Sequence, residues 1–254
     1  TDSLTFILIF DEPLDSLAGA SICNYSVDGG LTLQSAVSTP PLFNQVQLKL
    51  SSPMMLNSIY TITAANITDC KSNRIGVYNT ARTGLPSDPA PGEWIINEIL
   101  FNPRSNANDF VELFNNSNKI LDASKLFIAS RNSSGSMQSV KVLSQVPFYI
   151  FPGDHIVVTE DADNLALQYL VKNPGQVLVI SSPPSFPDDE GAVISLNFQG
   201  AVTDEVMYKD DWHFKLLVNT EGVSLERIDP SGYSQDPANW HSAASTAGYG
   251  TPTY

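Results

Sequence analysis

Apolar and polar residues alternate along the first third of the chain in the pattern of half-buried β-strands. Residues 46–50 read Val-Gln-Leu-Lys-Leu, and residues 60–63 read Tyr-Thr-Ile-Thr. A period of two places one face of each strand in a core and the other in water. Residues 4–10 form a continuous β-branched and aromatic run, which is typical of an interior strand. Together these segments predict a small β-sandwich over residues 1–82.

A proline-rich stretch separates this pattern from a second, longer one. Residues 83–92 read Thr-Gly-Leu-Pro-Ser-Asp-Pro-Ala-Pro-Gly. Prolines at this density are incompatible with a helix or a central strand, and they favour an extended spacer. We therefore interpret residues 83–92 as a linker and residues 93–254 as a second domain.

Strand patterns also dominate the second domain. We expect one helix in it, over residues 161–173, and one short helix over residues 14–22 of the first domain. The Gly-rich tail, residues 242–254, should form an irregular strap along the sandwich. The predicted fold class is all-β, with two immunoglobulin-like β-sandwich domains in tandem. The strands expected in the second domain cover residues 94–101, 109–115, 125–130, 138–143, 155–159, 177–181, 191–197, 203–207 and 223–228.

The net charge and the length of the apolar runs argue against a nucleic-acid partner and a membrane span. The net charge is −14, from 27 acidic and 13 basic residues. An acidic surface repels phosphate backbones, so we expect no nucleic-acid partner. No apolar run is long enough to span a membrane. The chain begins on Thr1 without an initiating Met or a signal sequence, and we interpret it as a mature or excised chain whose parent extends further at the N-terminal end.

The two cysteines, Cys23 and Cys70, both lie in the first domain. They are too few for a disulfide scaffold and lack the spacing of zinc ligands. Each lies beside a predicted turn, so in an oxidising compartment the two could come close enough to form a bond. The alternative is a pair of separate, partly buried thiols.

Three blocks of the second domain resemble the signatures of bacterial lamin-tail domains. The opening block combines Ile-Ile-Asn-Glu-Ile-Leu-Phe-Asn-Pro at residues 95–103 with Asp-Phe-Val-Glu-Leu-Phe-Asn at 109–115. A hydrophobic-Pro-Gly turn follows at residues 151–158, and the closing block covers residues 222–230 and continues to Asn-Trp240 and Tyr-Gly-Thr-Pro252. The resemblance implies an immunoglobulin-like β-sandwich and, in bacteria, an exported protein that often carries similar modules in tandem.

Short pieces of the first domain resemble bacterial immunoglobulin-like modules of surface-layer and cell-wall proteins. The matching pieces are Phe-Asp-Glu-Pro-Leu at residues 10–14, Asn-Tyr-Ser at 24–26, the strand at 58–63 and Asp-Cys-Lys-Ser-Asn at 69–73. Ser72 departs from the pattern, because a Gly commonly precedes the Asn there. The resemblance implies a spacer or adhesion module on a cell surface.

Three carboxylates occupy apolar strand surroundings. Glu98 lies among isoleucines, Glu112 lies between two phenylalanines on one strand face, and Asp109 begins the same strand. A buried carboxylate is costly unless it is paired or hydrogen-bonded. Glu98, Asp109 and Glu112 could therefore form a calcium site. We favour the other interpretation, in which each carboxylate accepts bonds from backbone donors or pairs with Arg227 of the closing strand.

The aromatic residues and the histidines are candidates for a binding surface and for a catalytic or metal site, respectively. An aromatic platform of Trp94, Trp240, Phe151 and Tyr249 could bind sugars or peptides, but aromatic residues near the ends of a sandwich more often fill its core, and we expect Trp240 to do so. The histidines show no metal-ligand spacing, and the chain has no nucleophile elbow and no phosphate loop.

These features indicate a non-catalytic structural or interaction module of an exported bacterial cell-surface protein. Its expected partner is a protein or a cell-surface glycan, and no cofactor is expected apart from calcium. The alternative is a carbohydrate- or peptide-binding accessory domain of a larger secreted hydrolase. Binding to a glycan array would distinguish the two functions.

Overall fold

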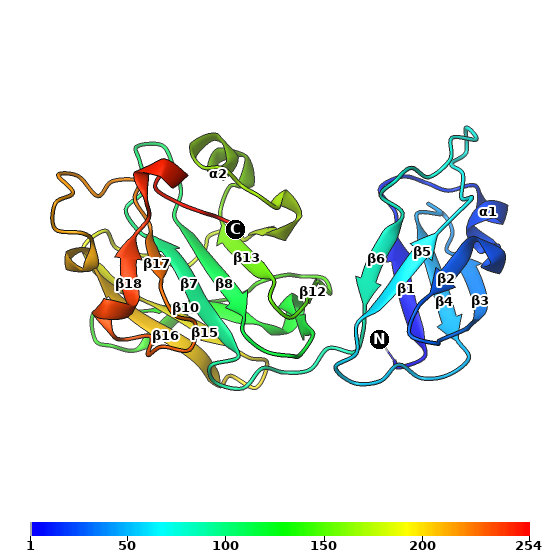
Figure 1. The fold of residues 1–254 in the computed structure, drawn as a ribbon, viewed down its shortest axis with the longest axis horizontal. Coiled ribbons are helices and arrows are strands. Elements are labelled where there is room, and N and C mark those ends of the chain that lie inside the picture. Colours follow the sequence, from blue (N-terminus) through cyan, green and yellow to red (C-terminus); the bar gives the residue numbers. More distant parts are fainter. Residues whose placement is uncertain (1) are drawn as a thin grey trace. The chain divides into compact units, whose positions relative to one another are not determined.

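The computed structural model describes residues 2–254. The chain forms two compact units, residues 2–86 and residues 87–254. Each unit is built from β-sheets with a few short helices (Figure 1). The structure therefore confirms the all-β prediction.

The first unit contains two three-stranded sheets. One has the order β1-β4-β3, and the other has the order β2-β5-β6, with every neighbouring pair antiparallel. Asp15 caps the helix of this unit by accepting bonds from two backbone N–H groups, Leu17 N at 3.1 Å and Ala18 N at 2.8 Å. The elements are β1 (Thr5–Ile9), α1 (Ser16–Ala20), a 3₁₀ helix (Ile22–Asn24), β2 (Tyr25–Val27), β3 (Leu33–Ser38), β4 (Gln45–Leu50), β5 (Tyr60–Ala64) and β6 (Thr80–Thr83).

The core of the first unit lies between these sheets. Val46, Leu48 and Leu50 of β4 are buried, while the intervening residues of β4 are exposed. The predicted alternation is therefore confirmed for this strand. The run at residues 4–10 differs from the prediction, because β1 is the edge strand of its sheet and not an interior strand. Its apolar composition does not result from burial on both faces.

The second unit contains two larger sheets and one small one. A six-stranded sheet has the order β14-β13-β8-β7-β17-β18, a four-stranded sheet has the order β11-β10-β15-β16, and β12 pairs with β9. The strands are β7 (Trp94–Leu100), β8 (Phe110–Asn115), β9 (Leu121–Asp122), β10 (Phe127–Arg131), β11 (Met137–Val142), β12 (Tyr149–Ile150), β13 (His155–Thr159), β14 (Val177–Val179), β15 (Glu190–Leu196), β16 (Val202–Lys209), β17 (Leu225–Arg227) and β18 (Trp240–Ser242).

One α-helix and several 3₁₀ helices connect these strands. Asp161 caps α2 (Ala162–Gln168) by accepting a bond from Asn164 N at 2.9 Å. The helix ends earlier than predicted, because Tyr169 adopts an extended conformation and its hydroxyl donates to Gly222 O at 2.9 Å. The 3₁₀ helices are Ala123–Lys125, Pro174–Gln176, Asp210–Trp212, Pro237–Asn239 and Ser245–Ala247.

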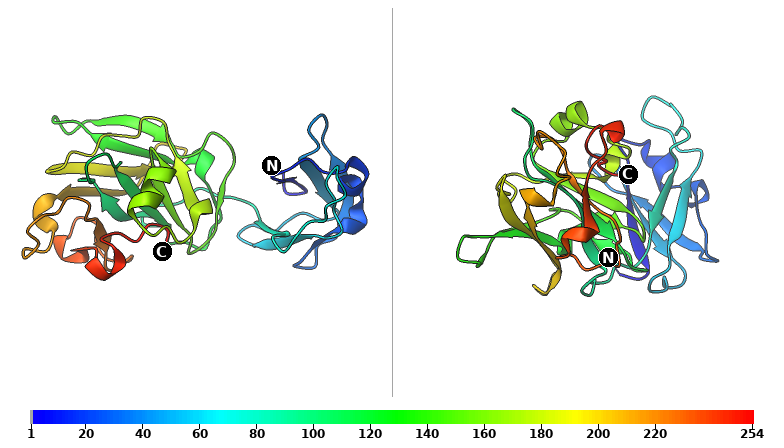
Figure 2. Two further views of the ribbon diagram at one scale, coloured as in Figure 1. Left: turned by 90° about the horizontal axis from the view of Figure 1, so that it is seen from above. Right: turned by 60° about the vertical axis from the view of Figure 1, so that its left-hand side comes forward.

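The six-stranded sheet of the second unit has an apolar cluster on each face. On β8, Val111 and Leu113 belong to the main core, whereas Phe110 belongs to a smaller cluster with Leu165 of α2 and with Tyr169. The C-terminal segment, red in Figures 1 and 2, crosses the face of the smaller cluster. The predicted strap along the sandwich is confirmed.

The boundary between the two units lies inside the stretch that we interpreted as a linker, and each unit includes part of this stretch. On the first side, Leu85 forms a β-bridge with Leu56. On the second side, Ser87 N donates to Ile120 O at 2.9 Å, and the buried Pro89 accepts a bond through its carbonyl oxygen. Little of this stretch is therefore available as a free spacer.

Candidate functional site

Three glutamates form a row across neighbouring strands of the six-stranded sheet. Glu98 of β7 lies directly opposite Glu112 of β8 on one side and Glu226 of β17 on the other. A β-bulge produces this alignment, because the register shifts by one residue between Ile96 and Glu98. We call Glu98, Glu112 and Glu226 the carboxylate row.

The bulge explains how Glu98 can lie within an apolar run. Ile96 and Ile99 both face the main core although they are three residues apart, since Asn97 is the extra residue of the bulge. Glu98 consequently faces the other side of the sheet, toward the C-terminal strap. Glu98 and Glu112 are both almost fully buried.

The carboxylate of Glu98 is satisfied by the closing segments of the chain. Ser224 Oγ donates to Glu98 Oε1 at 2.5 Å, and Thr251 N donates to the same oxygen at 3.0 Å. Thr251 Oγ1 lies 3.3 Å from Glu98 Oε2 and 2.7 Å from Glu226 Oε1. Thr251 therefore ties the strap to two members of the row.

The carboxylate of Glu112 holds the strap at a second point. Thr253 N donates to Glu112 Oε2 at 2.7 Å, and Asn97 Nδ2 donates to Glu112 Oε1 at 2.9 Å. The strap is also fixed from its other side, where Thr253 Oγ1 accepts a bond from Asn173 N at 2.8 Å. The carboxylate row therefore anchors the last four residues of the chain to the sheet.

Burial raises the pKa values of two members of the carboxylate row, Glu98 and Glu112. Loss of water, with a smaller contribution from the neighbouring Glu112, raises the pKa of Glu98 to about 8. Burial likewise raises the pKa of Glu112 to about 7. Because Glu98 and Glu112 are adjacent, the pair resists carrying two negative charges at neutral pH.

Glu98, Asp109 and Glu112, the alternative calcium set, are not brought together as one group of ligands. Asp109 faces different neighbours from Glu98 and Glu112: burial, and then the charge of Asp188, raises its pKa to about 7. Within residues 2–254, no three Asp, Glu, His or Cys side chains are grouped as metal ligands would be. Glu98 and Glu112 instead have the backbone partners that the structural interpretation requires.

Arg227 has a different acidic partner from the predicted Glu112. Its Nη1 forms a buried ion pair with Asp204 Oδ2 of β16 at 3.0 Å and also donates to Ile96 O at 2.9 Å. Asp204 Oδ2 accepts a further bond from Ile96 N at 2.9 Å. The pair joins the four-stranded sheet to the six-stranded sheet, and Ser234 Oγ contacts both charged groups.

The aromatic platform that the sequence left as an alternative does not lie on the surface. Trp94, Phe151 and Trp240 are buried, with Trp94 and Trp240 in the main core, and Tyr249 is half-buried. Trp240 also donates from Nε1 to Ser234 O at 3.0 Å. The expectation that Trp240 fills the core is confirmed.

A different aromatic hollow lies at the end of β18. It has a volume of about 410 Å³ and is lined by Trp212, His213, Phe214 and Trp240, among others. His213 is buried, and burial lowers its pKa to about 4. Its Nδ1 lies 2.9 Å from Ser242 Oγ, while its Nε2 has no hydrogen-bond partner among the described residues. Sequence reasoning missed this hollow, because its members come from separate segments.

The two cysteines of the first unit are more exposed than the sequence analysis expected. Cys23 and Cys70 are free thiols, and both are exposed. Cys70 Sγ lies 3.7 Å from Leu14 O. The thiols are therefore not partly buried, and a bond between them in an oxidising compartment stays a prediction.

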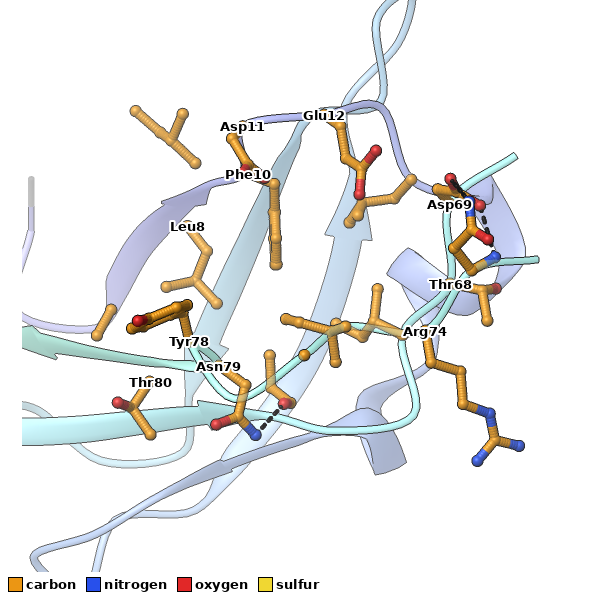
Figure 3. A pocket seen from close by; sticks show the side chains of 18 of the residues that line it. Leu8, Phe10, Asp11, Glu12, Thr68, Asp69, Arg74, Tyr78, Asn79 and Thr80 are labelled. Atoms are coloured by element: carbon orange, nitrogen blue, oxygen red, sulfur yellow. Dashed lines mark hydrogen bonds between the residues drawn. The ribbon is translucent and has the colours of Figure 1, made fainter. Parts of the chain in front are cut away.

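An open groove lies between the two sheets of the first unit (Figure 3). It has a volume of about 410 Å³ and runs between β1 and the segment that leads into β6. Leu8 and Phe10 point into it, and the exposed carboxylates of Asp11 and Glu12 lie at the end of β1. Sequence reasoning missed the groove because it assigned the residues of β1 to the sheet interior.

Comparisons with known proteins show only distant likenesses. No family model and no curated protein matches the chain. The N-terminal part of the bacterial S-layer protein SbsC is 12% identical with a TM-score of 0.31, and the match covers 82% of this chain and 42% of that one. A DUF4876 family protein from Bacteroides thetaiotaomicron is 11% identical with a TM-score of 0.41 over 99% of both chains. With identities and TM-scores this low, the two likenesses do not identify a function for this chain.

Proposed function

We propose that this chain is a non-catalytic structural and interaction module of an exported bacterial cell-surface protein. The observation that carries the proposal is the use of the buried polar groups. Glu98 and Glu112 hold the C-terminal strap, and Arg227 pairs with Asp204 between two sheets. These buried charged residues, which are of types that commonly serve chemistry, instead stabilise the fold.

A cell-surface location is supported by the sequence resemblances to lamin-tail domains and to immunoglobulin-like modules. The acidic composition agrees with such a location. Among the described residues, no helix has the length and apolar character needed to cross a membrane.

The location can be tested with an antibody against this chain. We expect it to label intact cells of the producing organism as strongly as permeabilised cells, and chemical cross-linking of intact cells should join the chain to other surface proteins. Labelling that requires permeabilisation would contradict the proposal.

The aromatic hollow supports a second candidate function, carbohydrate binding by an accessory domain. Trp212 is only partly buried, its ring centroid lies 6.4 Å from that of Trp240, and Phe214 beside it is exposed. Aromatic faces at the surface are suited to stacking on sugar rings. Oligosaccharides should then quench the Trp fluorescence of the wild type and bind the Trp212→Ala variant more weakly. No saturable quenching by any glycan on an array would exclude this candidate.

A further inference from the structure

Strand β1 leaves one edge of its sheet open. It is a terminal strand in the order β1-β4-β3. Phe10 N donates to Asn44 O at 2.8 Å. Given the register of β1 and β4, the backbone groups of the even-numbered residues of β1 therefore form the hydrogen bonds to β4. Hydrogen-bonded positions alternate along an antiparallel pair, so the backbone groups of Ile7 and Ile9 point away from β4.

Nothing in the sequence of β1 protects this edge. The strand, Thr-Phe-Ile-Leu-Ile, has no charged residue and no proline, and its register with β4 is unbroken. Edge strands normally carry such features because a bare edge pairs with other chains. The outward side chains of Ile7 and Ile9 are 56% and 73% exposed. At the opposite edge of the same sheet, α1 packs against β3.

The open groove lies directly beside this edge. Leu8 and Phe10 are half-buried at its wall, and Ile62 and Ile75 line it from the other side. Every second side chain of a strand added to β1 would enter the groove, because strand side chains alternate between faces. An apolar side chain at those positions would complete the burial of Leu8 and Phe10.

The charges at the end of β1 indicate what kind of strand fits. Asp11 and Glu12 are exposed, and within residues 2–254 neither carboxylate makes a hydrogen bond or an ion pair. Arg74, which also lines the groove, extends away from Leu8 and Phe10 (Figure 3). A partner segment with Lys or Arg at this end would complement the two acids.

A second copy of the chain is a poorer occupant. Two β1 strands paired antiparallel about Ile7 would place Glu12 of each copy opposite Asp2 of the other. Like charges directly opposite each other destabilise a strand pair. The charge pattern therefore favours a different polypeptide over self-association.

We propose that the groove of the first unit binds an extended segment of a partner protein as an added strand along β1. Alternate apolar side chains of that segment enter the groove, and a Lys or Arg lies beside Asp11 and Glu12. The site deepens the assembly role proposed above and rests on it for its biological meaning. It would give the module a specific means of joining another chain by strand addition.

The test uses the full chain and a fluorescently labelled peptide, Lys-Val-Thr-Val-Thr-Val-Lys. Saturable binding to the wild type is expected by fluorescence anisotropy. Ile7→Pro removes a backbone donor on the open edge but leaves the bonds to β4 in place. This variant should bind the peptide about tenfold more weakly, which corresponds to about 1.4 kcal/mol.

The matched control is Ala36→Pro in β3. Its backbone N–H also lies on the outward side, but at the opposite edge of the same sheet. Ala36→Pro should bind the peptide like the wild type, and circular dichroism should show that both proline variants remain folded. Equal loss of binding in both variants, or no saturable binding by the wild type, would overturn the proposal.

Charge reversal gives a second test that does not depend on proline. In the Asp11→Lys/Glu12→Lys variant, binding of the Lys-ended peptide should weaken severalfold, and binding of the same peptide with Glu at both ends should strengthen. Identical affinities of the variant and the wild type for both peptides would contradict the predicted chemistry of the partner.

Two other measurements separate the alternatives. If β1 serves as an interface between copies, sedimentation will show a wild-type dimer that Ile7→Pro dissociates, and this result would overturn the proposal of a different partner. An intracellular location would defeat the proposed function but leave peptide binding unchanged. Absence of peptide binding would defeat the strand site but leave the cell-surface location unchanged.

Discussion

The two units differ in whether other segments of the chain cover the exposed parts of their sheets. In the first unit, β1 has an open edge beside an apolar groove, and no other described segment covers it. In the second unit, α2 and the C-terminal strap cover the outer face of the six-stranded sheet, with Thr251 and Thr253 bonded to buried carboxylates. One unit therefore offers a surface for another chain, while the other uses its own chain to close a surface.

The acidic residues of the two units also differ, both in their surroundings and in the direction of their pKa shifts. In the first unit, surface hydrogen bonds lower acid pKa values: the side chain of Asn73 lowers that of Asp69, and the backbone of Leu4 lowers that of Asp2. In the second unit, burial raises the pKa values of Glu98 and Glu112. A single net charge thus describes two kinds of acid, namely charged surface groups and anchors for a backbone strap. Overall acidity is therefore a poor indication of calcium binding here.

The largest expected effect comes from breaking the buried ion pair that joins the two sheets of the second unit. Asp204→Ala leaves Arg227 charged, buried and unpaired, and should lower the free energy of unfolding by about 3–5 kcal/mol. Denaturant unfolding followed by Trp fluorescence measures this unit alone, since all three tryptophans lie in it.

Lys209→Met is the control for this variant, because Lys209 lies on the same strand in an exposed ion pair with Glu190 at 2.9 Å. Exposed pairs contribute little, so no measurable loss is expected. Similar losses in the two variants would mean that the Arg227–Asp204 pair does not hold the sheets together.

A smaller effect is expected when the strap loses one anchor. Glu112→Ala leaves the donors of Thr253 and Asn97 without their acceptor and should cost about 1–3 kcal/mol of unfolding free energy. The loss should be the same in calcium and in chelator, because backbone and amide groups satisfy this carboxylate. Glu190→Ala, a truncation of an exposed strand glutamate, serves as the control. A loss seen only in the presence of calcium would revive the metal interpretation.

The carboxylate row should also make the second unit sensitive to pH. Glu98 has a pKa of about 8 in the folded chain against an ordinary value of 4.5. The folded state therefore binds more protons than the unfolded state between these values, and stability falls as pH rises through this range. The fall should be about 1.4 kcal/mol for each pH unit within this range, the slope expected for one bound proton.

Thermal melts across this pH range, monitored by Trp fluorescence, would measure the fall. Glu98→Gln stays neutral at every pH, so its melting temperature should depend less on pH than that of the wild type. The remaining dependence should come mainly from Glu112 and Asp109, whose pKa values burial also raises. An unchanged pH dependence in Glu98→Gln would show that Glu98 does not titrate in the folded chain.

The sequence could predict the features that depend on local periodicity. On β8, alternation correctly separates Val111 and Leu113 from Phe110 and Glu112, and nearly all the longer strands of the second unit lie close to their predicted ranges. Some of the shortest strands, such as β9 and β6, were missed because so few residues cannot establish a period.

Features that depend on register between distant strands could not be predicted. Glu226 joins the carboxylate row only because β17 pairs with β7, and Glu98 faces the strap only because of the bulge at Asn97. The partner of Arg227 depends on how two sheets pack. The edge position of β1 could not be predicted either, because an apolar strand sequence does not show whether one or two neighbouring strands pair with it.

The smallest expected effect concerns the two thiols of the first unit. Cys23 and Cys70 are exposed and unbonded, so replacing both with Ser should change the unfolding free energy by no more than about 0.5 kcal/mol. Both thiols of the native wild-type protein should also react with a thiol reagent without denaturant. If the protein isolated from its own cells instead contains a disulfide between them, the double substitution will remove a cross-link and should cost about 2–4 kcal/mol. A loss of that size would mean that the first unit, like the second, is closed by a contact between distant parts of its own chain.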